Sequence, residues 1–142
     1  MLNKYWKLHF VNETGQTMTL ADGAIIEVRI MPWKLVAGVL TYGTVIIEDL
    51  GQTATIADQA VTVGDVVDNT SNLYLGAIGT AEITHDLDAA VGQCRIYMES
   101  CDDNVNWPSA ASDFVVTDLQ QVCVIPIDNS AVDKSRSKNF VL

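Results

Sequence analysis

The sequence has few basic residues, and they are unevenly placed. Eight Lys and Arg residues stand against eighteen Asp and Glu residues, which gives the 142-residue chain a formal charge of −10. Between Leu35 and Asp133 the only basic residue is Arg95, against fifteen acidic ones. Affinity for nucleic acids comes largely from neutralising phosphates, so such a body argues against a nucleic-acid-binding protein. It suits a solvated acidic surface or contact with a basic protein surface.

The sequence also lacks a long apolar run. No stretch approaches the roughly 18 apolar residues of a membrane-spanning helix. The first ten residues, MLNKYWKLHF, contain no apolar core followed by a small-residue cleavage site. We therefore expect neither a membrane segment nor a secretion signal. Apolar residues make up 49% of the chain and charged residues 18%, a balance typical of a folded domain, and the length fits a single one.

Residues that build metal and catalytic sites are scarce as well. The chain has three cysteines, none in a CxxC pair, and two histidines, a set that argues against a zinc site. It has no GxSxG sequence for a nucleophile elbow and no GxGxxG or GxxxxGK sequence for phosphate binding. The run DDNVN at 102–106 lacks the glycine and glutamate of a calcium loop, and we expect an Asx-rich hairpin turn there. We expect no catalytic residue, no cofactor and no metal ion.

What the sequence does contain is an alternation of apolar and polar residues with a period of two, which is typical of half-buried strands. Turn residues separate the alternating segments, and no capped helical stripe is present. The pattern predicts one all-β domain over residues 1–142, an antiparallel β-sandwich or jelly-roll-like barrel of about eight to ten short strands. Strands are expected at residues 5–10, 24–31, 35–41, 44–48, 73–78, 80–87, 93–100, 114–117, 121–127 and 139–142, with further short strands between 51 and 72.

The same pattern predicts the positions of individual residues. We expect Pro32 to end its strand, and Tyr42 and Gly43 to form the turn of a tight hairpin. We expect His9 on an exposed strand face and His85 at a strand end. The residues expected in the core are Ile26, Val28, Ile30, Ile96, Met98 and Ile125. The cysteines expected to be free thiols are Cys94, Cys101 and Cys123.

Residues 96–109 carry the most distinctive sequence of the chain, IYMESCDDNVNWPS. It resembles a strand and turn found in small β-sandwich structural proteins of tailed bacteriophages, where the usual form is YLE-S-x-DG-x-NWP. The closing residues 134–142, KSRSKNFVL, look like the last strand of the same kind of protein. Where the family has Asp-Gly, this chain has Asp103 and Asn104, and Asn also tolerates a positive φ. The resemblance implies a capsid decoration (cement) protein or a tail or neck component.

The C-terminal segment is the main candidate for contact with a partner. In an extended strand its three basic residues project from one face, and two apolar residues continue the same parity. The segment either closes its own sheet or adds to a neighbouring subunit. Two tryptophans beside prolines are further candidates, because exposed aromatic rings can bind sugars. The candidate interface residues are Lys134, Arg136, Lys138, Phe140, Leu142, Trp33 and Trp107.

These observations lead to one main hypothesis and three alternatives. We predict a non-enzymatic bacteriophage virion protein, a capsid decoration protein that stabilises the shell, made in the host cytoplasm and carried in the virion. Its expected partners are the major capsid protein or other virion proteins and further copies of itself in a homo-oligomer, with neither nucleic acid nor a membrane. A tail or neck subunit is the first alternative. A carbohydrate-binding module is the second, and an enzyme is the last.

Overall fold

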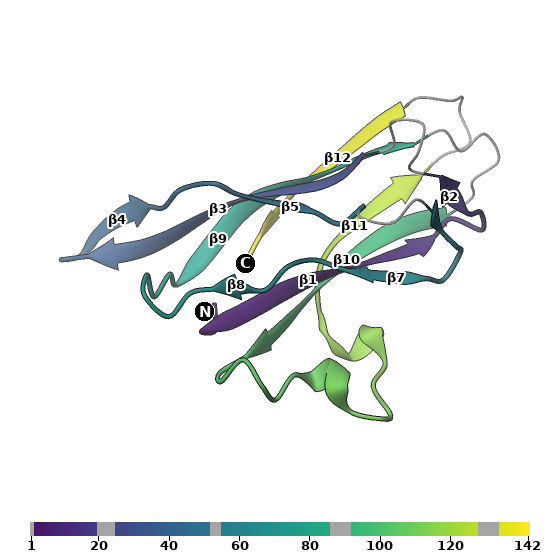
Figure 1. Ribbon diagram of the computed structural model, residues 1–142. Coiled ribbons are helices and arrows are strands. Elements are labelled where there is room, and N and C mark those ends of the chain that lie inside the picture. Colours follow the sequence, from purple (N-terminus) through teal and green to yellow (C-terminus); the bar gives the residue numbers. More distant parts are fainter. Residues whose placement is uncertain (1, 20–24, 52–54, 86–91, 128–133) are drawn as a thin grey trace.

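The structure is a computed structural model that describes residues 2–19, 25–51, 55–85, 92–127 and 134–142 (Figure 1). Its strands are β1 (Tyr5–Glu13), β2 (Met18–Thr19), β3 (Ile25–Val36), β4 (Val39–Tyr42), β5 (Ile46–Asp49), β6 (Thr55–Ile56), β7 (Val61–Val63), β8 (Val67–Asp68), β9 (Gly76–His85), β10 (Gly92–Cys101), β11 (Gln120–Ile127) and β12 (Lys134–Val141). The first sheet has the order β11-β10-β1-β7, with β8 also paired to β1. The second sheet has the order β12-β9-β3-β4, with β5 also paired to β3. The two sheets pack into the expected all-β sandwich.

The core lies between the two sheets. Alternate residues of β1 point into it, and Trp6, Leu8 and Phe10 are all buried. The residues expected in the core are confirmed as buried, and these are Ile26, Val28, Ile30, Ile96, Met98 and Ile125. All three cysteines are buried and free, which confirms that expectation too. The alternation predicted the phase of these strands correctly because one face of each is covered by the other sheet.

The edges of the two sheets meet along both sides of the sandwich. On one side β11 and β12 lie in contact. On the other, the Thr62 hydroxyl donates to the Leu50 carbonyl at 2.7 Å, and the Asp65 N–H donates to Glu48 at 3.2 Å. Burial raises the pKa of Glu48. These contacts join β5 to the segment around β7, so the core is closed laterally.

The strand that contains Pro32 is longer than expected, because β3 continues through the proline to Val36. Beside Pro32 the neighbour of β3 changes from β5 to β4. The Pro32 carbonyl accepts the Gly43 N–H at 2.8 Å on that side. A residue in an antiparallel strand directs its N–H and C=O to the same side. The N–H that Pro32 lacks would therefore point to the place where the partner of β3 changes from β5 to β4 and the ladder is interrupted. Pro32 therefore costs no ladder hydrogen bond.

The tight hairpin turn also lies elsewhere than expected. It is formed by Ala37 and Gly38, which have φ values of 50° and 82°, between the paired residues Val36 and Val39. Positive φ at both central residues matches the right-handed twist of a two-residue hairpin. The prediction of a turn at Tyr42 and Gly43 is wrong, because this stretch instead links β4 to β5.

The remaining strand predictions are partly correct. Short strands between 51 and 72 are confirmed, and His85 is buried at the end of β9. The two strands expected around Gly79 are a single strand, β9, in which Gly79 faces Phe140. A Cβ atom at Gly79 would lie 2.4 Å from the Phe140 ring, so the aromatic side chain fills the space above the glycine. The last strand begins at Lys134 rather than at residue 139.

Residues 102–119, here called the covering segment, connect β10 to β11 and lie over the outer face of the first sheet (Figure 1). The segment contains two short 3₁₀ helices, Pro108–Ala110 and Val116–Asp118. The strand predicted at 114–117 is therefore wrong. Within the described ranges, no comparable segment crosses the outer face of the second sheet.

Candidate functional site

A polar cluster is buried between the first sheet and the covering segment. The Lys7 Nζ lies 3.1 Å from the Glu99 Oε2, and the His9 Nε2 donates to the same oxygen at 2.8 Å. From the covering segment, the Ser109 N–H donates to the other carboxylate oxygen. His9 is 2% exposed and Glu99 is fully buried. The prediction that His9 lies on an exposed face is wrong, because the covering segment lies over that face.

The charges of this cluster follow from its contacts. Burial raises the pKa of Glu99, but hydrogen bonds from Ser109, His9 and Lys7 outweigh that effect and hold the pKa below its usual value. Burial lowers the pKa of His9, and the contact with Glu99 offsets this only in part. At neutral pH the carboxylate is therefore charged and the imidazole is neutral. Because the side chains of His9 and Glu99 are enclosed, the cluster fastens the covering segment and does not present a catalytic pair to a substrate.

Sequence reasoning missed this cluster, although two aromatic residues give a signal. The Lys7 Nζ lies 4.2 Å from the centroid of the Trp107 ring, and the His9 and Phe114 ring centroids are 6.3 Å apart. Both aromatic residues follow β10 in a connection too long for a simple hairpin. Aromatic side chains in such a connection indicate that it packs against the sheet.

The acidic run at the start of the covering segment forms the expected Asx-rich turn. Asp103 accepts the N–H groups of Val105 and Asn106, each at 2.9 Å, and these bonds hold its pKa below the usual range. Asn104 has a φ of 59°, which confirms that this residue takes the left-handed conformation that Asn tolerates. The turn opens the covering segment instead of joining two paired strands. In the described part of the chain, no three His, Cys, Asp or Glu side chains are grouped to hold a metal.

The C-terminal candidates lie on and just after β12, which pairs with β9 of its own chain. Phe140 is 7% exposed and belongs to the core. Leu142 exchanges two backbone hydrogen bonds with Ala77, at 2.8 and 3.0 Å. In this structure the segment therefore closes its own sheet.

The three basic candidates alternate along β12. Arg136 and Lys138 have the same parity as Phe140, so they do not lie on the outer face of the second sheet. Lys134 pairs with His85 through the backbone, and its side chain is outside the described structure. Contact of these residues with a partner stays a prediction.

The two candidate tryptophans lie on opposite sides of the sandwich. Trp33 is on the outer face of the second sheet opposite Gly76, where a Cβ atom would lie 2.6 Å from the indole. Trp107 lies over Lys7 on the outer side of the first sheet. The two rings therefore do not form a joint platform for a sugar.

The outer face of the second sheet changes from acidic to apolar along its strands. Directly opposite residues of paired strands share a face, so the register defines rows across it. Successive rows are about 6.7 Å apart. The row that follows Ile25 and Thr84, here called the acidic row, holds Asp49, Glu27 and Glu82. The next holds Ile47, Arg29 and Thr80, and the third holds Met31, Ile78 and Val141.

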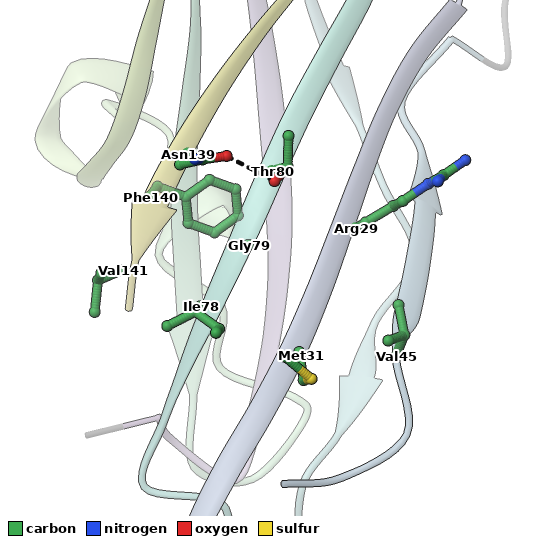
Figure 2. A pocket seen from close by; sticks show the side chains of 9 residues that line it. All are labelled: Arg29, Met31, Val45, Ile78, Gly79, Thr80, Asn139, Phe140 and Val141. Atoms are coloured by element: carbon green, nitrogen blue, oxygen red, sulfur yellow. Dashed lines mark hydrogen bonds between the residues drawn. The ribbon is translucent and has the colours of Figure 1, made fainter.

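The third row borders an open hollow of about 470 Å³ (Figure 2). Met31, Val45, Ile78 and Val141 line it, and we call these four residues the apolar face. Val141 is 73% exposed and Val45 is 47% exposed. Figure 2 shows the Phe140 ring across Gly79 on the β12 side of the hollow. The floor of the hollow is the second sheet itself.

Beyond the apolar face, β3 and β4 continue as a projecting hairpin, here called the arm (residues 35–42) (Figure 1). Large apolar side chains are exposed on both of its sides: Leu35, Leu40 and Tyr42 on the side of the apolar face, and Val36 and Val39 on the other. The sequence from 35 to 47 contains no charged residue. A two-stranded ribbon cannot bury such side chains by itself.

The described residues include no helix that is long and apolar enough to cross a membrane. Comparison of the chain with protein-family models, curated proteins and solved structures found no significant match. The features that bear on function are the two outer faces, of which one is covered by the chain itself and the other is apolar and open in the described ranges.

Proposed function

We propose that the chain is a non-enzymatic structural subunit of a bacteriophage virion, a capsid decoration protein that attaches to the shell through the apolar face and the arm. The observation that carries this proposal is the exposure of contiguous large apolar side chains, from Val141 and Ile78 through Val45 to Leu35 and Leu40. Contiguous exposed apolar patches of this kind mark interaction surfaces. A solvated monomer gains nothing from such a surface.

The contrast between the two outer faces supports the same proposal. The chain uses the covering segment to enclose the outer face of the first sheet along β1 and β10, where even a histidine and a glutamate are buried. Among the residues that the structure describes, none covers the more apolar outer face of the second sheet in this way. A protein that covers one face of its sandwich and not the other is built to have the second face covered by a partner.

The resemblance of residues 96–109 to phage structural proteins supports the virion assignment. Three of its residues, Glu99, Trp107 and Ser109, fasten the covering segment to the sheet. The motif therefore has a structural role. Related β-sandwich proteins would share that role even if they bind different partners. The proposal includes the location in the virion: the chain decorates the shell and does not belong to the tail.

The experiment uses phage heads assembled without this chain, to which the purified protein is added. Val141→Asp places a charge on the apolar face, and Val105→Asp is its matched control on the covering segment. The two valines are 73% and 72% exposed. We expect both variants to unfold at the same temperature as the wild type. We expect the wild type and Val105→Asp to attach to heads, and Val141→Asp to remain in the supernatant.

The outcomes separate the parts of the proposal. Wild-type protein that copurifies with tails and not with tail-less heads would show a tail or neck subunit instead. Attachment of Val141→Asp at wild-type level would show that the apolar face is not the contact. Binding to a glycan array that is lost in Trp33→Ala or Trp107→Ala would favour a carbohydrate-binding module.

A further inference from the structure

The acidic row carries an inference about the partner. Asp49, Glu27 and Glu82 lie side by side across β5, β3 and β9 on the outer face of the second sheet. Carboxylates directly opposite one another on a sheet repel each other. Arg29 pairs with Glu27, and the Ser135 hydroxyl donates to Glu82 at 2.7 Å. On the described part of this face, three acidic residues and one basic residue leave an excess of negative charge.

The acidic row has a fixed position relative to the apolar face. Glu27 and Met31 are four residues apart on β3, so the two rows are separated by about 13 Å. The row between them contains the exposed Ile47 and the paired Arg29. A surface that covers the apolar face over the area of an ordinary interface would extend over the acidic row as well.

We propose, resting on the function proposed above, that the partner is a protein surface with an apolar centre and Lys or Arg side chains about 13 Å from that centre, which meet the acidic row. A second copy of the chain does not fit this description. Its formal charge of −10 would bring two acidic bodies together. An apolar partner without basic residues would desolvate Asp49 and Glu82, which have hydrogen bonds but no basic side chain opposite them, and this is costly.

Charges at the rim of an interface act mainly on the association rate and on its dependence on salt. Two isosteric substitutions remove charge from the row and keep its hydrogen bonds. Glu82→Gln keeps an acceptor for Ser135, and Asp49→Asn keeps the oxygen that accepts the Gly51 N–H at 2.9 Å. The matched control is the double variant Asp113→Asn, Asp118→Asn, which removes the same charge from exposed positions on the covering segment.

The first measurement is the association rate with heads assembled without this chain, between 20 and 500 mM NaCl. We expect the Glu82→Gln, Asp49→Asn protein to associate about three- to tenfold more slowly than wild type at the lowest salt and to be less sensitive to salt. The control variant should keep the wild-type rate and salt dependence. Equal rates and equal salt dependence for the row variant and the control would show that the partner has no Lys or Arg residues opposite the acidic row.

A second measurement does not depend on the heads. A synthetic peptide with an apolar half of Leu and Val and a Lys-rich half is titrated into isotope-labelled protein, beside a peptide with Glu in place of Lys. We expect only the Lys peptide to shift the amide resonances of both the apolar face and the acidic row, with about three- to tenfold weaker binding to the row variant. No binding, or equal binding of both peptides, would overturn the inference.

The failure of this inference differs from the failure of the proposed function. If Val141→Asp abolishes attachment to heads while the row variant behaves as the control does, the docking face stands and the basic partner is wrong. If heads do not bind the wild type but the Lys peptide binds as described, the decoration role is wrong and the basic partner stands. If the chain alone sediments as an oligomer that Val141→Asp dissociates, the occupant is a second copy, and the inference is wrong.

Discussion

Ile96 shows at the scale of one residue how the fold is stabilised. Its side chain is fully buried between the sheets at the centre of β10, where it stands opposite Phe10 of β1 and Cys123 of β11. Ile96→Ala should lower the free energy of unfolding by about 2 to 4 kcal/mol, because the removed methyl groups leave a cavity that a two-sheet core cannot close. Urea unfolding followed by fluorescence measures this change. A loss below about 0.5 kcal/mol would mean that the site is not well packed.

His9 gives a prediction about pH. Burial lowers its pKa in the folded protein below the value of 6.5 that applies to an exposed histidine, so the unfolded chain takes up a proton more readily. The free energy of unfolding is therefore at its full value with respect to His9 above about pH 7.5. It decreases as the pH falls through 6.5 toward the lower pKa of His9 in the folded protein. Glu99, whose pKa is also lowered, adds a further loss only below about pH 4.5.

The measurement is the free energy of unfolding of wild type and His9→Gln between pH 5.5 and 7.5. Glutamine keeps a donor for Glu99 and does not titrate, so the difference between the two profiles isolates His9. We expect wild type to lose stability more steeply than the variant on acidification. Parallel profiles would contradict the lowered pKa.

At the scale of elements, β12 shows which part of the closing strand the fold requires. Deletion of residues 139–142 removes the buried Phe140 side chain and the two hydrogen bonds between Leu142 and Ala77. It also exposes Gly79, which Phe140 covers. We expect this deletion to unfold the chain, as judged by the loss of the cooperative thermal transition. Val141→Ala, a change at an exposed position, should keep the transition and serves as the control. A folded deletion variant that no longer attaches to heads would instead show that the segment acts between subunits.

The elements also show how far sequence reasoning reaches. Strands with one face against the other sheet, such as β10 and the first half of β3, can be predicted in place and in phase from the sequence, because their period-two alternation follows that burial. The covering segment was not predicted, since its residues follow no period and its effect is to bury polar groups such as His9 that the alternation assigns to solvent. The Ala37 turn was missed because Ala seldom adopts a positive φ. The docking face is hard to predict because the outward residues of β3 are apolar in succession only beyond Arg29, and Pro32 in that stretch indicates the end of a strand.

At the scale of the whole molecule, the sandwich has two sides with different roles. The first sheet and its covering segment form a closed side, in which polar residues are buried and paired. The second sheet presents the apolar face, the arm and the acidic row on an open side. The core residues between the sheets hold these two sides together. Motions that expose the core therefore have to separate the sheets, whereas motions of the covering segment do not.

The cysteines report these two kinds of motion separately. Cys94 and Cys123 point into the core between the sheets, and burial raises their pKa values to about 12 and about 11. Cys101 has the outward parity of β10 and donates to Asp103 at the start of the covering segment. A thiol reacts as its thiolate and only when reagent reaches it. Opening of the acidic turn is enough to expose Cys101, but the other two thiols require separation of the sheets.

We therefore expect an alkylating reagent to modify Cys101 first in the native protein, and Cys94 and Cys123 later and at the same rate as each other, at the rate of global unfolding. Intact-mass analysis with peptide mapping follows the three sites over time, and Ile96→Ala should accelerate only the later two. In denaturant without reductant all three thiols should be modified, because none is in a disulfide. Modification of a single thiol under those conditions would reveal a disulfide. Simultaneous reaction of all three in the native protein would show that the covering segment and the core open together, which the separation of the two sides does not allow.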